Sequence, residues 1–232
     1  MIGIIGAMDI EVRLLQQKME DTKTTVIGMD SFTEGILYGH RAVISQCGPG
    51  KVNAAICTQN MITAFRPDAV LNVGVAGAGC PKVHVGDVVV ALDPVQHDMD
   101  TSPIGDPVGY VSKIGLIRIP CDAQFSQELV NAVKTAGGRT VHAGTIATGD
   151  QFIHDEARRN RIHDLFGAMA VEMEGSAVAH VCYANHVPCG VLRTISDESN
   201  GEAGISYATF AQQAAEHGQK VVRKLMEGMD DE

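Results

Sequence analysis

The sequence has no run of lysine and arginine residues, and basic side chains are outnumbered by acidic ones. Its formal net charge is −10 over 232 residues. A nucleic-acid-binding surface needs clustered positive charge to neutralise phosphates. This class is therefore disfavoured, and we expect no nucleic-acid partner.

Regular cysteine spacing and long hydrophobic runs are also missing. The six cysteines form no Cys-x-x-Cys pair, which is typical of small core residues in a reducing compartment. The apolar run within MIGIIGAMDIE is too short to span a membrane and lacks the basic flank of a signal peptide. We therefore expect a cytoplasmic protein with no membrane partner.

Common ligand-binding motifs are absent as well. There is no His-Glu-x-x-His motif, and residues 97–100 (HDMD) have no matching group of metal ligands elsewhere. The glycines of residues 72–79 have the wrong spacing for a dinucleotide fingerprint, and residues 48–51 lack the first glycine of a P-loop. We expect neither a metal ion nor an organic cofactor.

What is present is a hydrophobic content of 45%, arranged as alternating strand-like and helix-like segments. Several strands are apolar at successive positions, which indicates burial on both faces. This alternation predicts an α/β fold with a central, largely parallel sheet and helices on both sides. The predicted strands are residues 1–6, 41–46, 69–74, 87–92, 141–147, 168–172 and 190–196.

The predicted helices are amphipathic or uniformly apolar. They comprise residues 11–19, 51–65 with an apolar stripe of Val52, Ala55 and Ile56, 175–186, and 206–226 capped by Ser206. Residues 24–37 indicate a hairpin that extends the sheet. Residues 94–121 form the longest stretch without periodicity, typical of a functional loop or a contact region. We find no linker and expect one domain over residues 1–232.

Three carboxylates follow predicted strands. Glu11 follows the first strand, Glu174 follows residues 168–172, and Asp197 ends residues 190–196. Each glutamate alone could simply favour a helix N-terminus. Because ligands bind at the carboxyl ends of strands in open α/β sheets, the three together favour a site.

Two glycine-rich stretches leave alternatives open. Residues 72–79 (NVGVAGAG) are predicted to follow a buried strand, and residues 48–51 (GPGK) to open a helix. Either stretch could let a ligand approach the backbone or could be a tight turn that packs a helix on a strand.

Six sequence blocks recur in one order in a known family. They are Gly3-Ile4-Ile5-Gly6-Ala7-Met8 with Glu11, residues 48–55 (GPGKVNAA), 72–78, 148–153 (TGDQFI), 171–174 (VEME) and 193–197 (RTISD). With these blocks the chain resembles bacterial 5′-methylthioadenosine/S-adenosylhomocysteine nucleosidases of the purine nucleoside phosphorylase superfamily. The resemblance implies a three-layer fold with a central mixed sheet. It also implies a homodimer with sites near its interface and a small-molecule nucleoside substrate.

The resemblance also implies residue roles. Asp197 looks like the acid at N7 of the adenine, and Glu11 like the base that activates water. Glu174 and the backbone of Met173 look like the clamp on the ribose hydroxyls, and Arg193 like a helper for the water and the carboxylates. The other residues assigned to substrate binding are Phe152 and Ile153 at the base, Met8, Pro49, Val75, Gly77, Glu172, Ser196 and Tyr207, and Ile104.

The implied chemistry is consistent with these residue types. Adenine leaves poorly as an anion, so an acid at N7 lets it leave neutral while the ribose gains oxocarbenium character. Because a free aspartate titrates near 3.9, Asp197 must be desolvated or hydrogen-bonded as the acid to donate a proton near neutrality.

The chain departs from the family pattern at two places. Val75 stands where several relatives have a small hydroxyl residue. Residues 98–114 (DMDTSPIGDPVGYVSKI) differ from the family form DxDxTAFGYxYGQ, with Ile104 near the position of an aromatic residue. In relatives that region reaches the partner subunit's site, so the pocket for the thio-substituent is expected to differ in shape.

The sequence bears on three alternative functions. Phosphorolysis is disfavoured because related phosphorylases carry Arg and Ser where this chain has Asn72 and Val75, and a dianion needs charge-assisted donors. Hydrolysis of aminodeoxyfutalosine, which some relatives cleave, stays open. A silent nucleoside-binding protein is disfavoured because it has no use for a water-activating base.

Overall fold

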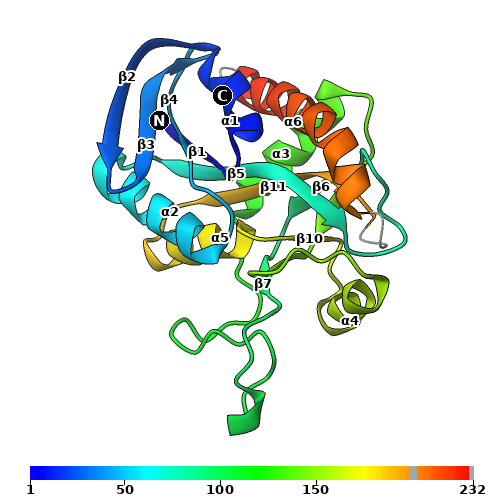
Figure 1. Ribbon diagram of the computed structural model, residues 1–232. Coiled ribbons are helices and arrows are strands. Elements are labelled where there is room, and N and C mark those ends of the chain that lie inside the picture. The colour runs from blue at the N-terminus through cyan, green and yellow to red at the C-terminus, as the bar shows by residue number, and fades with distance from the viewer. Residues whose placement is uncertain (199–202, 230–232) are drawn as a thin grey trace.

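A computed structural model describes residues 1–198 and 203–229, with only the backbone of residues 203–209. The strands of this part of the chain form one eleven-stranded mixed sheet (Figure 1). They are β1 (Ile2–Gly6), β2 (Met19–Ile27), β3 (Asp30–Leu37), β4 (His40–Gln46), β5 (Ala69–Ala78), β6 (Val88–Ala91), β7 (Val95–Gln96), β8 (Val141–Gly144), β9 (Ile146–Thr148), β10 (Ala170–Glu172) and β11 (Cys189–Asp197).

The centre of the sheet is parallel. β1 pairs in parallel with β4 and β5, and β5 pairs in parallel with β11. Antiparallel pairing occurs in the β2–β3–β4 meander, between β11 and β6, and between β10 and β5. Every residue of β1 and β11 is buried. The predicted α/β fold, its doubly covered strands and the hairpin extension are confirmed.

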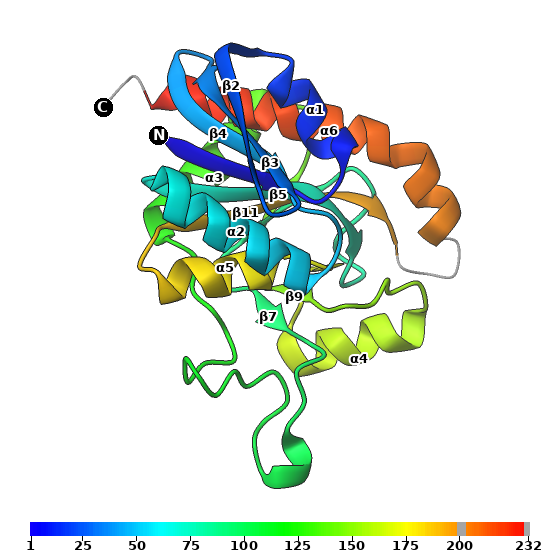
Figure 2. The same cartoon turned by 60° about the vertical axis from the view of Figure 1, so that its left-hand side comes forward.

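Helices cover both faces of the sheet (Figure 2). They are α1 (Asp9–Gln16), α2 (Lys51–Phe65), α3 (Ala123–Ala136), α4 (Glu156–Phe166), α5 (Gly175–Ala184) and α6 (Ala203–Gly228). Apolar side chains of α1, α3 and α6 pack on one face, and those of α2 and α5 on the other. The three-layer arrangement is thereby confirmed. Among the helices of the described residues, none has the length and apolar character needed to cross a bilayer.

Several sequence-based predictions of elements are corrected. The segment 141–147 is two strands, because the chain changes partners at Thr145: β8 pairs with β6, and β9 pairs with β10 and β7. Residues 72–78 belong to β5 and do not follow it, since they pair with β11 and then β10. Ser206 does not begin α6, which starts at Ala203. Two helices, α3 and α4, were not predicted.

The apolar stripe predicted on α2 faces outward. The helix has the predicted bounds, but its buried residues are Ala54, Cys57, Thr58 and Met61. Val52 is 67% exposed and Ile56 is 49% exposed. Since α2 carries apolar residues all around, periodicity alone could not indicate which side packs on the sheet.

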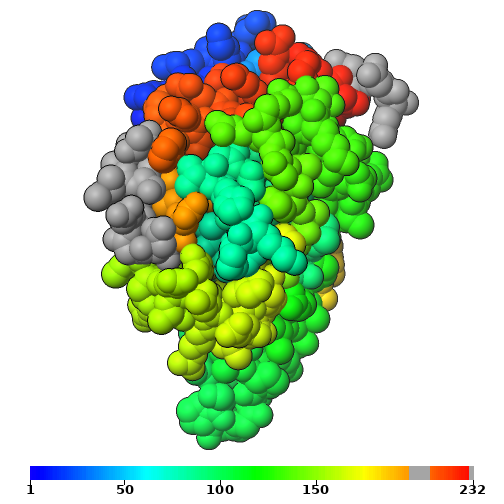
Figure 3. Space-filling model, turned by 90° about the vertical axis from the view of Figure 1, so that its right-hand side faces the viewer, coloured from blue at the N-terminus to red at the C-terminus, as the bar shows by residue number. Residues whose placement is uncertain are grey.

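Residues 97–118, here called the arm, project from the sheet beyond β7 (Figures 1 and 3). The arm is mostly irregular, as its lack of periodicity predicted, with a short 3₁₀ helix at Ser102–Ile104. Ile104 is 82% exposed. The arm therefore carries a large apolar side chain that is open to solvent.

Candidate active site

A cavity of about 270 Å³ lies where β1, β10 and β11 end, beside the last residues of β5. Its size is just below the roughly 300–1,000 Å³ of small-molecule sites. It is lined by Ala7, Met8, Glu11, Pro49, Val75, Ala76, Gly77, Gln151, Phe152, Ile153, Val171, Glu172, Met173, Glu174, Ser196 and Asp197. Four carboxylates from three parts of the chain therefore meet at one site.

A larger groove, of about 820 Å³, lies at the opposite ends of β1 and β5. Two of its acidic side chains are neutralised by neighbours: Asp68 by the amino group of Met1, and Glu227 by Lys224. The smaller cavity is the candidate active site, because the four carboxylates that meet there are buried.

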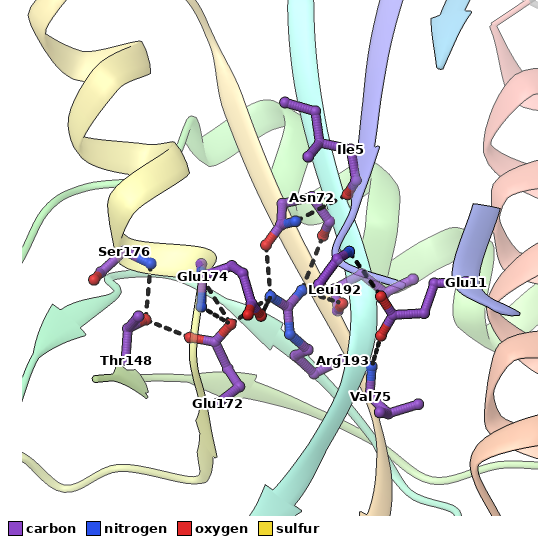
Figure 4. Close-up of polar contacts among 12 residues, drawn as sticks. Ile5, Glu11, Asn72, Val75, Thr148, Glu172, Glu174, Ser176, Leu192 and Arg193 are labelled. Atoms are coloured by element: carbon purple, nitrogen blue, oxygen red, sulfur yellow. Dashed lines mark hydrogen bonds and ion pairs between the residues drawn. The ribbon is translucent and has the colours of Figure 1, made fainter. Parts of the chain in front are cut away.

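Three backbone N–H groups hold the carboxylate of Glu11. Ala7 and Met8 donate to Oε2 at 2.8 and 2.9 Å, and Val75 donates to Oε1 at 3.0 Å (Figure 4). Met8 at the helix N-cap makes no side-chain capping bond, so Glu11 in the first turn of α1 reaches back to it. Burial raises the pKa of Glu11, although Arg193 and these N–H groups oppose the shift. A buried carboxylate with a raised pKa is suited to accept a proton.

Arg193 of β11 is fully buried and does not line the cavity; its guanidinium lies between the carboxylates of Glu172 and Glu11 (Figure 4). Its guanidinium donates to Asn72 at Oδ1 (2.6 Å) and at the carbonyl oxygen (3.3 Å), and it pairs with Glu172. Burial lowers the pKa of Arg193, but Glu172, Glu174 and Glu11 together raise it above its usual value. Arg193 is therefore a permanent positive charge that acts on these carboxylates.

Glu172 and Glu174 follow each other closely but have different environments. Glu172 accepts bonds from the Thr148 hydroxyl, from Arg193 and from the backbone N–H groups of Glu174 and Gly175 at 3.0 and 2.7 Å. Glu174 accepts one bond from the Gly50 N–H at 2.9 Å, and its Oε2 lies 3.8 Å from Arg193.

Burial and the neighbouring Glu172 raise the pKa of Glu174 to about 7, against the lowering by Arg193 and Gly50. Its second oxygen is not held by a backbone donor, unlike both oxygens of Glu11. Glu174 is therefore the carboxylate of this pair that can bind a ligand hydroxyl.

Asp197 reaches the cavity through an irregularity in β11. Its register with β5 shifts between Ile195 and Asp197, so that Ala76 and Gly77 oppose three residues of β11. Such a bulge re-aims side chains, and Ser196 and Asp197 both line the cavity although they are successive. The Ser196 hydroxyl lies 3.1 Å from Oδ2 of Asp197, to which it donates.

The segment after β9 contributes two large apolar side chains to the cavity wall. Ile153 is buried, and Phe152 is 48% exposed beside the cavity. Met173, directly after β10, and Val75 of β5 also contribute. A cavity lined by both apolar side chains and carboxylates fits a heterocycle attached to a sugar.

Most residues assigned from the sequence lie around this cavity. The exceptions are Arg193, Ile104 on the arm, and Tyr207, whose side chain lies outside the described residues. Ala7, Ala76, Gln151 and Val171 also line the pocket, and Asn72 and Thr148 support it, although none of these residues was predicted as part of the site. A polar residue inside a buried strand was the available signal for Asn72. Within residues 1–198 and 203–229, no group of three or more His, Cys, Asp or Glu side chains is arranged to hold a metal ion.

A family model described as "Phosphorylase superfamily" matches residues 1–227. The chain belongs to the phosphorylase superfamily. A 5′-methylthioadenosine/S-adenosylhomocysteine nucleosidase of Staphylococcus aureus (strain bovine RF122 / ET3-1) is 39% identical over 97% of this chain and 99% of its own.

Two solved structures have nearly the same fold as this chain. One is a nucleosidase of the same name from Neisseria meningitidis in complex with methylthio-immucillin-A. It has a TM-score of 0.94 and 35% identity over 98% of each chain. The other is the futalosine hydrolase of Helicobacter pylori, with a TM-score of 0.92 and 33% identity over 98% of this chain and 97% of that one.

Proposed function

We propose that the protein is an N-ribosyl hydrolase that cleaves 5′-methylthioadenosine and S-adenosylhomocysteine into adenine and the 5-thioribose product. Relatives of that name, similar along the whole chain, support the choice of substrate. The observation that carries the proposal is the convergence of Glu11, Glu174 and Asp197 on one cavity.

Asp197 acts as the acid. It donates a proton to N7 as the bond between N9 and the ribose breaks, so the bonding electrons remain on adenine and adenine leaves neutral. Burial of Asp197 supplies the desolvated environment that such an acid needs, and the Ser196 hydroxyl, which donates to Oδ2, orients the carboxyl group.

Glu11 acts as the base. It takes a proton from water as the water oxygen attacks the anomeric carbon, and its three N–H bonds fix the carboxylate for that step. Glu174 and the backbone of Met173 hold the ribose hydroxyls. The negative charge of Glu174 also stabilises the developing oxocarbenium ion.

Hydrolysis is favoured over phosphorolysis because the Glu11 carboxylate occupies the N–H groups that could otherwise bind a phosphate. The N–H groups of Ala7, Met8 and Val75, which could bind a phosphate, all donate to Glu11. Asn72 faces away from the cavity, toward Arg193 and the carbonyl of Ile5. A second anion beside Glu11 would meet a like charge, and these three N–H groups are already engaged by Glu11.

The second candidate function is hydrolysis of aminodeoxyfutalosine. The similarity to the Helicobacter pylori futalosine hydrolase favours it. Aminodeoxyfutalosine differs from the thio-substituted adenosines in its 5′-substituent. The arm, which is expected to reach the 5′ end of the pocket, is also where this sequence departs from the family form. Base and ribose recognition would be unchanged.

Adenine release from purified protein tests the proposal. We expect turnover of a panel of 5′-substituted adenosines without added phosphate, and compare methylthioadenosine, S-adenosylhomocysteine, 5′-deoxyadenosine and aminodeoxyfutalosine. Strict dependence on phosphate would establish phosphorolysis. Tight nucleoside binding without adenine release would establish a silent binder.

We also propose that the protein acts as a homodimer, with the arm of each subunit completing the 5′ end of its partner's site. The exposed apolar side chains of Val52 and Ile56 on α2, and of Ile104 on the arm, support this proposal. The cavity of one chain, at about 270 Å³, is small for a thio-substituted nucleoside and fits a site that a partner extends.

The chain is proposed to be one catalytic domain that acts in the cytoplasm in methionine salvage. The family match over residues 1–227 supports a single domain. Its six cysteines are all buried and unpaired, which fits a reducing compartment.

A further inference from the structure

Three segments around the cavity meet in a closed cycle of hydrogen bonds. Lys51 Nζ donates to Asp98 Oδ1 at 2.6 Å, the Asp150 N–H donates to Asp98 Oδ2 at 2.8 Å, and the Lys51 N–H donates to Asp150 Oδ1 at 2.8 Å. The side chains of Lys51 and Asp98 are only 18% and 17% exposed. The cycle therefore joins the start of α2, the base of the arm and the segment that carries Phe152 and Ile153.

The cycle compensates for the missing cap of α2. Gly50 is the N-cap residue, with φ 97° and no side chain, so it cannot cap the helix itself. Asp150 supplies the capping oxygen from 99 positions away. A Cβ on Gly149 would lie 2.3 Å from Nε2 of His97 and 3.1 Å from Cγ of Asp98, so the segments are closely packed.

The same helix start controls the ribose clamp. Gly50 precedes Lys51 in the chain, and its N–H donates to Oε1 of Glu174. Any shift of the α2 N-terminus moves the one backbone donor that orients Glu174. Phe152 and Ile153 follow Asp150 directly, so the base wall would shift with it.

We propose that Asp98 is a positioning residue. Through Lys51 and Asp150 it fixes the Gly50 N–H against Glu174, and so links the arm to the ribose end of the site. The role of Glu174 in this inference rests on the proposed function. Asp98 itself does not line the cavity.

The pH profile separates positioning from a general structural role. The groups that face Glu174 are Glu172 of β10, Arg193 of β11, Glu11 of α1 and the Cys47 thiol. The Gly50 bond favours ionised Glu174, so weakening it raises the pKa of Glu174 further. The acid limb of kcat/KM would therefore move to higher pH.

D98N, K51M, K51R and the double variant K51M/D98N test the inference. In D98N, the side-chain amide has one acceptor oxygen for the two groups that donate to Asp98, which are Lys51 Nζ and the Asp150 N–H, so the cycle opens. We expect kcat/KM to fall about tenfold to a hundredfold, mainly through KM because Glu174 holds the ribose before and during the reaction. K51R keeps the cation and should stay near wild type, and the double variant should lose no more than the worse single variant.

Hydrogen exchange at the Gly50 and Lys51 amides gives a readout without substrate. We expect faster exchange in D98N than in wild type. K224M and E227Q are the matched controls, because each breaks the ion pair on α6 in which Lys224 Nζ lies 2.7 Å from Glu227 Oε2. Neither control should change the kinetics or the exchange rates of the Gly50 and Lys51 amides.

The two proposals fail differently. If wild type releases adenine but D98N keeps the control values of KM, acid limb and amide exchange, the inference is wrong. If wild type releases no adenine, the proposed function is wrong, and amide exchange alone still decides whether Asp98 fixes the start of α2.

Discussion

At the scale of single residues, Glu172 and Glu174 show how environment assigns different tasks to identical side chains. Four donors surround Glu172, including Arg193, whereas Glu174 has one backbone donor. Glu172 balances the buried arginine. Glu174 retains an oxygen for a ligand and has a raised pKa of about 7.

This raised pKa predicts a pH-dependent gain in stability for E174Q. Folding favours the protonated form, so the stability that Glu174 contributes is fully present below about pH 4.5 and is lost as pH rises through about 7. Relative to wild type, E174Q should gain on the order of 3 kcal/mol in unfolding free energy between pH 4 and pH 8. Urea unfolding at both pH values measures it.

The exposed Glu216 on α6 provides the control for this experiment, and E216Q should show no such trend. If the difference in unfolding free energy between E174Q and wild type were the same at pH 4 and at pH 8, the raised pKa of Glu174 would be contradicted.

The acid role of Asp197 gives a second residue-scale prediction. D197N keeps the size of the side chain but cannot donate the proton, so kcat should fall about 10²–10⁴-fold or more. Circular dichroism should show a normal fold. A folded D197N variant with wild-type turnover would disprove the assignment.

At the scale of elements, the sequence was sufficient where burial imposes a simple pattern. The strands β1, β4 and β11 and the helix α2 were predicted within about two residues at each end. The helix α4 was missed because it is mostly polar. The helix α3 was also missed, although Asp122 caps it by accepting a hydrogen bond from the Phe125 N–H. The split between β8 and β9 depends on partner strands, which local sequence does not specify.

The candidate site was predictable only in part for the same reason. Glu11, Glu174 and Asp197 were recognisable because each follows an apolar strand. The support from Asn72 to Arg193 and from Gly50 to Glu174 joins residues more than 100 positions apart. Such contacts follow from how the strands are ordered in the sheet, which no single segment encodes.

A glycine within α6 gives the element-scale prediction. A Cβ at Gly218 would meet nothing within 4 Å, and its φ is not positive. G218A should therefore stabilise the protein by about 0.5–1 kcal/mol, because alanine loses less backbone entropy in a helix. Thermal unfolding measures this. A lower melting temperature would show that α6 cannot accept the methyl group there.

At the scale of the whole molecule, the arm and the outer side of α2 present apolar side chains to solvent. If subunits meet there, V52K/I56K should weaken the dimer and lower activity at low protein concentration. Sedimentation velocity over a dilution series tests this. M229K is the control. Met229 is 38% exposed and directly follows α6, which packs on the opposite face of the sheet from α2. Equal dissociation of both variants would place the interface elsewhere.

The register shift near the end of β11 makes the spacing of this strand as important as its composition. Ser196 is the extra residue that lets two successive side chains face the cavity. Removing it would restore simple alternation and move Asp197 into the place of Ser196, so its carboxyl group would lie one residue, about 3.3 Å, back along the strand from its present position. Laboratory evolution of this enzyme should therefore accept conservative exchanges among the apolar residues of β11, but no single-codon deletion between Thr194 and Asp197.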